Sequence, residues 1–481
     1  MNYLDLLRLA APEATLVLTA LVVLALGLVN ARASGICSAV AAAGLLFASS
    51  AVLMLPLQAT LFNGMLVITP LTSLFKIICL ALAFFTVILA RSLRSRHHGE
   101  YLALLLLATV GLMLLVGSEE LLVIFIGLEL TGLSLYIMAA FDKTDIRSAE
   151  AGLKYFLFGS TASAFTLFGI SLIYGMTGTT SLAVVATKIG TMTPLLSAGI
   201  IMTLIGFAFK VAAAPFHLWA PDTYQGAPVP SAAFISSASK VASFVVLGKI
   251  VLVGFGPAQG AAGWHALVAG WAPLLAVLSA LSILIGNLVA LAQSNVRRLL
   301  GYSAVAHAGY TLLGLVAGGR DGFSATLFYT TVYAFTLVGA FAVVAVVRRE
   351  TGGDDFAHFA GLRARSPWLA GCMAVFMLSL AGIPPLGGFF GKFYLFSAAL
   401  RAGNNQGLLW LVALALFGSL ISFYYYLMVL KVIFVDDPQA PAPVVRLDFL
   451  QRASIAFLAL LVLFLGVFPG GLVWKITSSL P

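Results

Sequence analysis

The stretch "SLAGIPPLGGFFGKFYLF", from Ser379 to Phe396, breaks an apolar segment in its middle. Two adjacent prolines, Pro384 and Pro385, and several glycines interrupt the segment, and a single lysine, Lys392, follows them. A proline inside a helix removes one backbone hydrogen bond and leaves the carbonyl four residues earlier unsatisfied. At membrane depth such a defect is tolerated only where it is buried in protein or lines a wet cavity. The stretch therefore predicts an ion or proton station inside a membrane helix.

The composition of the chain supports a membrane setting for this stretch. Of its 481 residues, 61% are hydrophobic and 9% are charged, whereas a soluble globular protein has about 25% charged residues. The net charge of +9 is assigned to membrane topology and not to nucleic-acid binding, because no basic run is interleaved with aromatic residues. Three scattered cysteines, Cys37, Cys79 and Cys372, have no metal or haem spacing. We therefore expect an all-α polytopic protein of the lipid bilayer that binds no nucleic acid and no metal.

Fourteen apolar segments are long enough to be transmembrane helices, since a bilayer core needs about 20 apolar residues per helix. The predicted spans are residues 12–30, 35–57, 66–90, 101–117, 121–141, 150–175, 194–219, 229–254, 269–293, 299–318, 323–347, 368–400, 408–434 and 453–475. The first is predicted as a retained helix and not a cleaved signal, because no basic region and cleavage site accompany it. The longest polar stretch, residues 348–367, is predicted as a loop.

Lysine and arginine are distributed unevenly between the two sides of these spans. Connections after odd-numbered spans hold Arg32, Arg91, Arg94, Arg96, Lys143, Arg147, Arg297, Arg298, Arg348, Arg349, Arg363, Arg365, Arg446 and Arg452. The other side holds Arg8, Lys188, Lys249, Arg320, Arg401 and Lys475. Cytoplasmic loops carry the excess of positive residues, so both termini are predicted to be periplasmic. With no transit segment visible, we expect the bacterial plasma (inner) membrane.

Ionisable residues near the centres of the predicted spans are the candidate functional residues. Each costs roughly 2.5–3.5 kcal/mol on insertion scales. Four of them, Glu129, Lys210, Lys240 and Lys392, lie in four separate helices. Four central charges are difficult to explain as tolerated accidents, and we interpret them as a functional set.

Other ionisable residues in the spans allow two interpretations. Lys154 and Lys249 lie nearer to helix ends and could extend to the lipid headgroups, which is the favoured interpretation for Lys249. Lys76, in "LTSLFKIICL", is deeper, but a tilted peripheral helix could accommodate it. His217 and His307 are either neutral packing residues or members of a proton path.

The two proline breaks occupy matching places in the chain. Pro215 falls in the seventh predicted span, and Pro384–Pro385 falls in the twelfth. Each is the fourth member of a five-helix set, which points to an internal repeat with a midplane site. Five is odd, so the two sets would be inverted in the membrane. The predicted units are residues 1–95, three N-terminal helices; 100–255 and 265–435, the two five-helix repeats; and 450–481, a C-terminal helix.

Four motifs are similar to those of one family, the antiporter-like subunits of respiratory complex I. They are "FKVAAAPFHLWAPDTYQGAPVPSAAFISSASK", "NLVALAQSNVRRLLGYSAVAHAGY", "SLAGIPPLGGFFGKFYLF" and "SFYYYLMVLKVIF". The resemblance runs from about residue 100 to residue 435. Within the family it favours the subunit N branch of bacterial NADH:quinone oxidoreductases. Subunit M carries glutamate where Lys392 stands, and subunit L is longer, with a lateral helix after its fourteenth segment.

The resemblance implies a proton path along the membrane midplane, coupled to quinone reduction elsewhere in the complex. It implies fourteen helices, with one proton half-channel in each repeat. By motif, the implied roles are a carboxylate–lysine pair for Glu129 and Lys210, a connecting lysine for Lys240 and a terminal lysine for Lys392. Lys154 matches the family's lysine in the sixth helix and His307 its histidine in the tenth, and His217 is a further candidate from the sequence itself. Several subunit N chains have an acid where this chain has Thr69, so the chain departs from the family pattern there, close to Lys76.

The redox chemistry of such a complex is expected on partner subunits. The chain has no cysteine cluster and no G-x-G-x-x-G after a strand, so NAD, FMN, iron–sulfur clusters and quinone would be bound by other chains. The expected partners are other membrane-arm subunits, including other antiporter-like ones. Two alternatives remain. The chain could be a stand-alone secondary transporter or a subunit of a multi-subunit cation/proton antiporter, or it could be a purely structural membrane anchor.

Overall fold

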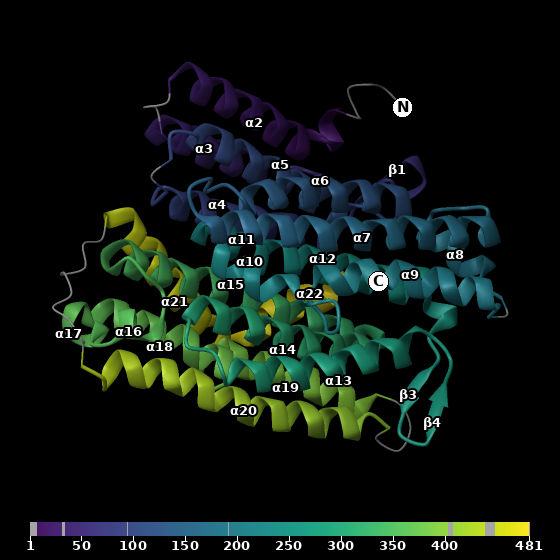
Figure 1. Cartoon of the computed structure of the whole chain (residues 1–481). Coiled ribbons are helices and arrows are strands. Elements are labelled where there is room, and N and C mark those ends of the chain that lie inside the picture. The colour runs from purple at the N-terminus through teal and green to yellow at the C-terminus, as the bar shows by residue number, and fades with distance from the viewer. Residues whose placement is uncertain are drawn as a thin grey trace.

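Nearly all of the chain is helical in the computed structural model, which describes residues 7–30, 34–93, 95–190, 192–402, 407–437 and 448–480. The helices lie side by side in one bundle (Figure 1). Twelve helices within these ranges are long and apolar enough to cross a membrane, which confirms an all-α polytopic membrane protein. Of the charges used for orientation, Arg32, Arg94 and Arg446 lie outside the described residues.

The helices and strands follow one another with short connections. In chain order they are α2 (Ala11–Val29), α3 (Ser34–Leu53), β1 (Ala59–Leu61), β2 (Leu66–Ile68), α4 (Pro70–Ala90), α5 (His98–Gly117), α6 (Leu121–Ala139), α7 (Ile146–Thr177), α8 (Leu182–Lys188), α9 (Pro194–Lys210), α10 (Trp219–Gly226), α11 (Val229–Ser236), α12 (Ala238–Lys249), β3 (Ala261–Gly263), β4 (Ala266–Val268), α13 (Trp271–Ala290), α14 (Val296–Ala317), α15 (Gly319–Thr351), α16 (Phe356–Phe359), α17 (Leu362–Arg365), α18 (Pro367–Ala381), α19 (Gly387–Arg401), α20 (Leu409–Phe434), α21 (Phe449–Val467) and α22 (Pro469–Ser479).

The predicted span over residues 66–90 is wrong at its start. Its first residues form β2, which pairs antiparallel with β1. The Thr72 N–H donates a hydrogen bond to Thr69 Oγ1 (3.2 Å), and the Thr69 N–H donates to Thr72 Oγ1 (2.8 Å). This capping box, with Pro70 at the first helical position, fixes the start of α4. A second hairpin, β3–β4, lies at the same end of the bundle (Figure 1).

Two further predictions from the sequence are corrected near the C-terminus. The span predicted over residues 453–475 ends early, because α21 ends at Val467 and Pro469 begins a separate helix. Proline cannot continue a helix, but it suits the first turn of a new one. The loop predicted over residues 348–367 is helical in part, since α15 continues to Thr351 and the short helices α16 and α17 follow it.

Both predicted breaks are present, but their prolines lie between helices and not inside them. The links are residues 211–218, between α9 and α10, and residues 382–386, between α18 and α19. Each link contains one residue in the left-handed region, Ala212 with φ 59° and Gly382 with φ 85°. Such a conformation costs an alanine about 1 kcal/mol or more and persists only where the surrounding structure enforces it. Each link therefore has a conformation set by its neighbours.

The centre of the bundle is formed by α15 and α14. The most apolar window of α15 is completely buried, whereas that of the peripheral helix α7 is one third buried. α15 packs against α4, α11, α12, α14, α18, α19, α21 and α22. It thus holds together α4, α11 and α12 of the N-terminal half, the interrupted segment α18–α19 and the C-terminal helices.

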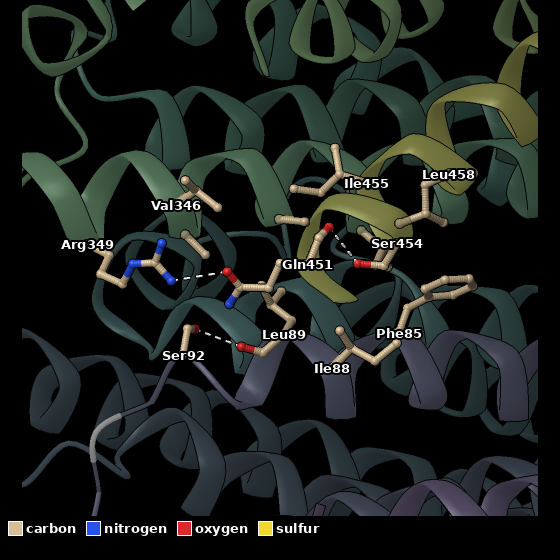
Figure 2. Close-up of a pocket in the computed structure, with 13 residues that line it drawn as sticks. Phe85, Ile88, Leu89, Ser92, Val346, Arg349, Gln451, Ser454, Ile455 and Leu458 are labelled. Carbon is tan, nitrogen blue, oxygen red and sulfur yellow. Dashed lines mark hydrogen bonds between the residues drawn. The ribbon is translucent and has the colours of Figure 1, made fainter. Parts of the chain in front are cut away.

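A small pocket marks the place where α21 packs against α4 and α15 (Figure 2). Phe85 of α4 and Leu458 of α21 contribute to its apolar wall. At its polar edge, the Arg349 guanidinium donates a hydrogen bond to Gln451 Oε1 (3.1 Å). None of the central charges identified in the sequence lines this pocket, so the candidate site lies elsewhere.

Candidate functional site

Glu129 shares one face of α6 with Gly132 and Tyr136, because positions i, i+3 and i+7 of a helix lie on the same side. From α7, Ser163 Oγ donates a hydrogen bond to the Glu129 carboxylate, which is half-buried. A Cβ at Gly132 would lie 3.1 Å from both Lys210 Nζ and Tyr136 Oη. The missing side chain at Gly132 therefore gives Lys210 access to the face that carries Glu129.

Lys210 is the last residue of α9, and it is 6% exposed. Its Nζ lies 5.6 Å from the centroid of the Tyr136 ring and makes no hydrogen bond with any described residue. The partial negative charge at a helix C-terminus favours a cation there. The structure thus brings the predicted carboxylate–lysine pair to one place without a direct hydrogen bond between the two groups.

The link that follows Lys210 is stabilised by contacts with its surroundings. The Ala214 N–H donates a hydrogen bond to Ser282 Oγ of α13 (2.8 Å). The indole Nε1–H of Trp219 donates to the Phe209 carbonyl (3.1 Å). Irregular backbone at membrane depth requires such partners. Because α13 belongs to the second predicted repeat, the break in one half is stabilised by the other half.

Lys240 lies just after a further interruption that the sequence analysis missed. The span predicted as one helix over residues 229–254 is divided into α11 and α12 at Ser237. Lys240 is 2% exposed, and its Nζ donates a hydrogen bond to the Ala304 carbonyl of α14 (2.6 Å). The Tyr333 ring centroid lies 5.6 Å from the same ammonium. The connecting lysine therefore contacts the second half directly.

His307 lies one turn after Ala304 on α14, at the centre of a group of tyrosines. Its Nδ1 is 2.5 Å from Tyr329 Oη, and its Nε2 is 3.0 Å from Tyr426 Oη. The Tyr333 ring centroid is 4.8 Å from the imidazole centroid. A cavity of about 10 Å³ beside the ring has room for about one water molecule. Each ring nitrogen of His307 thus lies next to a tyrosine hydroxyl, a group that can exchange a proton with it.

Lys392 contacts the break that opens the sequence motif. Its Nζ donates hydrogen bonds to the Ala381 carbonyl (3.1 Å) and to Ser419 Oγ of α20 (2.8 Å). Ala381 is four residues before Pro385, so its carbonyl is the one that a proline leaves without a helical partner. The Tyr310 ring centroid lies 5.1 Å from the ammonium. Lys392 thus supplies a hydrogen bond to the Ala381 carbonyl, the backbone group that the break leaves without a helical partner.

α14 connects Lys240 with Lys392 through one row of groups. Ala304, His307 and Tyr310 are three residues apart and lie on neighbouring positions of its surface. The first accepts the hydrogen bond from Lys240, and the last lies against Lys392. His307 lies between them, and its ring centroid is 5.7 Å from that of Tyr310. Three predicted site residues are thus gathered around one helix.

Lys154 and His217 lie apart from this row. Lys154 Nζ forms ion pairs with Glu150 (2.5 Å) and with Asp222 of α10 (2.6 Å), and Asp222 also pairs with Arg298 (2.5 Å). The Lys154 side chain is 38% exposed. His217 lies in the link after Lys210 and is 6% exposed. The structure thus places Lys154 in an ion-pair network and His217 within the first break.

The tyrosines around these charges were not found from the sequence. Two of them had a usable signal, since Tyr136 is seven residues after Glu129 and Tyr310 is three after His307, both helical spacings. Tyr329 and Tyr426 come from other helices and are distant in sequence from His307. Only the packing of α15 and α20 against α14 places them there.

Buried amines, a carboxylate and an imidazole in a bundle of apolar helices define the class of this chain as an integral membrane protein with protonatable groups in its interior. In the part of the chain that the structure describes, no three His, Cys, Asp or Glu side chains are grouped so that they could hold a metal ion. The chemistry that these groups offer is the uptake and release of protons.

Comparison with known proteins assigns the chain more closely. Residues 118–422 match the family described as NADH:quinone oxidoreductase/Mrp antiporter, transmembrane. The chain is 45% identical to NADH-quinone oxidoreductase subunit N 2 of Acidobacterium capsulatum, over 97% of this chain and 98% of the relative. It is 40% identical to subunit N of Desulforamulus reducens, over 86% and 85%. A chain of respiratory complex I from Thermus thermophilus with bound Aureothin has a TM-score of 0.81, with 32% identity over 97% of this chain and 100% of that chain.

The chain therefore belongs to the NADH:quinone oxidoreductase/Mrp antiporter membrane family, and within it to subunit N of the NADH-quinone oxidoreductases. This confirms the resemblance seen in the four sequence motifs.

Proposed function

We propose that this chain is a proton-translocating subunit of the membrane arm of an NADH:quinone oxidoreductase. We further propose that Glu129, Lys210, Lys240, His307 and Lys392 are the groups that carry protons through it. Membership of the subunit N family supports the first statement. The observation that carries the second is the row on α14, which gathers two buried lysines and a histidine along one helix.

In the first half, the distance between Glu129 and Lys210 would control whether the lysine keeps its proton. Burial disfavours a charged amine, and a nearby carboxylate favours it. Movement of Glu129 away from Lys210 would break an N–H bond of the ammonium and pass the proton to water or to the next group. Transfer of one charge against 100 mV requires roughly 2.3 kcal/mol, which a small rearrangement in a low-dielectric interior can supply.

In the second half, a proton released by Lys240 would move along α14 to His307 and then to Lys392. The imidazole can bind a proton at one nitrogen and release another from the opposite nitrogen. The hydroxyls of Tyr329 and Tyr426 contact its two nitrogens, so either could form part of the path. Lys154 and His217 would act at the margin of this path, in the ion-pair network with Asp222 and in the link after Lys210.

The membrane arrangement completes the proposal. We propose that α9–α10 and α18–α19 each also cross the membrane as one interrupted span, which would raise the twelve candidate spans to fourteen. Residues 100–255 and 265–435 would be the two inverted repeats, and the termini would face the periplasm of a bacterial inner membrane. Other membrane-arm subunits would be the partners, and NAD, FMN, iron–sulfur clusters and quinone would be bound elsewhere in the complex.

A cation/proton antiporter subunit is the competing function. The identity of 45% to subunit N over nearly the whole chain favours the respiratory assignment. Identification of the subunits that co-purify with the chain from its native membrane would distinguish the two, because redox subunits are expected only in the respiratory complex.

Proton pumping by variants tests the relay. We expect Glu129→Ala, Lys210→Ala and Lys240→Ala each to lower NADH-driven proton pumping in membrane vesicles, measured with a pH-sensitive dye alongside NADH:quinone turnover. Lys431→Ala is the matched control, because Lys431 lies on the membrane helix α20 but its side chain is 56% exposed and forms an ion pair with Asp436, outside the proposed relay. Normal pumping in all three relay variants would refute the proposed relay.

A further inference from the structure

A second group of charges lies where α2, α4 and α12 meet the end of α5. Lys76 Nζ is 2.6 Å from the Glu13 carboxylate. Lys249 Nζ is 3.4 Å from the Glu119 carboxylate and donates a hydrogen bond to the Val116 carbonyl (2.9 Å). The two lysine side chains are 1% and 4% exposed. Lys249 therefore does not extend to the lipid headgroups, which corrects the interpretation favoured from the sequence.

The two ion pairs meet at the C-terminus of α5. A Cβ added to Gly117 would lie 3.2 Å from Lys76 Nζ, and Lys249 binds the carbonyl of the residue before it. The partial negative charge of a helix C-terminus favours both ammonium groups. Replacing a buried ion pair by apolar side chains is often neutral or stabilising, so stability alone does not explain two such pairs side by side.

One member of the group has a substantially exposed side chain. The Glu119 side chain is 31% exposed, compared with 9% for Glu13. The main chain of Glu119 is fixed on both sides, because its N–H donates to the Gly64 carbonyl (2.8 Å) and its carbonyl accepts from the Leu182 N–H (2.9 Å). β1 and α8 lie at this end of the bundle (Figure 1), which the charge bias predicts to face outward.

The group is connected to the proposed relay through α12. Lys249 is nine residues after Lys240 on this helix, which corresponds to about 13.5 Å along its axis. The helix continues from Lys249 as a π-helical turn over Ile250–Gly254, a form that is frequent at functional sites. Lys240 therefore lies near the start of α12, and Lys249 lies at its end, on the side of the bundle where Glu119 is found.

We propose that Glu13, Lys76, Glu119 and Lys249 form a proton-release station, through which protons leaving the buried lysines reach the water on the outer side. This is a second route out of Lys240 beside the path along α14: a proton that moves from Lys240 toward Lys249 would pass from the Lys249 ammonium to the Glu119 carboxylate and from there to water. The Glu13–Lys76 pair fixes the charge beside this step. This inference rests on the proposed function, because it needs a proton that arrives from the relay.

Glu119→Gln in the intact complex is the central test, because it removes the exposed carboxylate but keeps its size. We expect pumping to fall about ten-fold, less than the full loss of a positioned proton-transfer group, because water replaces part of its role. Small weak acids that enter the open site, such as formate, should restore the rate. Glu120→Gln is the matched control. Glu120 is the adjacent glutamate, but its carboxylate accepts a hydrogen bond from the Val123 N–H at the start of α6, which glutamine can also do.

A second variant separates release from a structural role. Glu13→Gln combined with Lys76→Met removes the inner pair together, so that no charge is left buried alone. We expect a complex that assembles to normal levels and pumps several-fold more slowly.

The Glu119→Gln and Lys210→Met variants together distinguish the release station from the relay. If Glu119→Gln pumps normally while Lys210→Met does not, the release station is refuted and the relay stands. A loss in Glu119→Gln that formate does not restore, with less assembled complex, also refutes it in favour of a structural joint. Normal pumping by Lys210→Met would refute the relay and, with it, the release station that depends on the relay.

Discussion

The two segments interrupted by proline, α9–α10 and α18–α19, place their lysine on opposite sides of the break. In α9–α10 the lysine precedes the break, whereas in α18–α19 it follows the break. Lys210 has a carboxylate nearby on α6 and no hydrogen bond among the described residues. Lys392 has two hydrogen bonds, to the Ala381 carbonyl and to Ser419 Oγ, and both acceptors are neutral.

This difference shows how the two lysines can respond to different signals. In the proposed relay, the charged state of Lys210 would depend on the carboxylate of Glu129 on α6, so that an electrostatic change could displace its proton. The charged state of Lys392 depends on dipoles that are fixed by the break itself. Proton movement at Lys392 is therefore expected to follow the arrival of charge from His307, not the movement of a partner carboxylate.

Lys210→Met should have the largest effect on pumping, because it removes the proton carrier that the first half depends on. We expect NADH-driven pumping to fall about a hundred-fold, the lower range for removal of a positioned proton-transfer group. The initial rate of dye quenching in inverted membrane vesicles, normalised to the amount of assembled complex, measures this. Lys431→Met should pump at the normal rate, and an unaffected Lys210→Met enzyme would remove the first half from the proposed path.

Lys392→Met should have the next largest effect. We expect pumping to fall about thirty-fold, somewhat less than for Lys210, because water can occupy the space between the Ala381 carbonyl and Ser419 and carry part of the proton flow. The proposed role as a proton carrier also predicts that Lys392→Arg loses as much activity as Lys392→Met, because arginine can donate to both acceptors but cannot release its proton. Normal pumping by Lys392→Arg would show that hydrogen bonding, and not proton release, is the role of Lys392.

Much of this arrangement was predictable from the sequence, and the reason is the cost of charge in a membrane. Glu129, Lys210, Lys240 and Lys392 stand out because an ionisable residue in an apolar helix is rare. The breaks stand out because proline and glycine disrupt helices. Both signals depend on single residues and their neighbours, so one sequence is sufficient to read them.

Other features depend on contacts between distant segments and could not be predicted. The pairing of Lys249 with Glu119 follows from the packing of α12 against α5, whereas hydropathy alone suggested a lysine that reaches the headgroups. The interruption at Ser237 has no proline to mark it. The short strand β2 was predicted as helix because its apolar residues resemble those of the span that follows. In each case tertiary structure decides between two local conformations that the sequence allows.

Glu129→Gln tests whether Lys210, unlike Lys392, depends on a nearby carboxylate. Glutamine can still accept the hydrogen bond from Ser163, but it carries no charge, so Lys210 would lose the group that favours its protonated state. We expect pumping to fall about ten-fold, the equivalent of one pKa unit of interaction. The measurement is the pumping rate relative to NADH oxidation. Glu129→Asp, which keeps the charge, should be less affected, and an equal loss in both would indicate a steric role.

Ser419→Ala should have the smallest effect and tests the other side of the comparison. The change removes one of the two hydrogen bonds to the Lys392 ammonium and leaves the bond to the Ala381 carbonyl in place. A single hydrogen bond contributes about 1 kcal/mol net, so we expect pumping to slow roughly five-fold. The neighbouring Ser422→Ala is the control, because Ser422 donates to the Ser419 carbonyl within α20. If Ser419→Ala pumps at the wild-type rate while Lys392→Met does not, the carbonyl freed by the break holds the lysine without help from the hydroxyl. The second half would then depend on its backbone alone, in sharper contrast to the carboxylate-controlled first half.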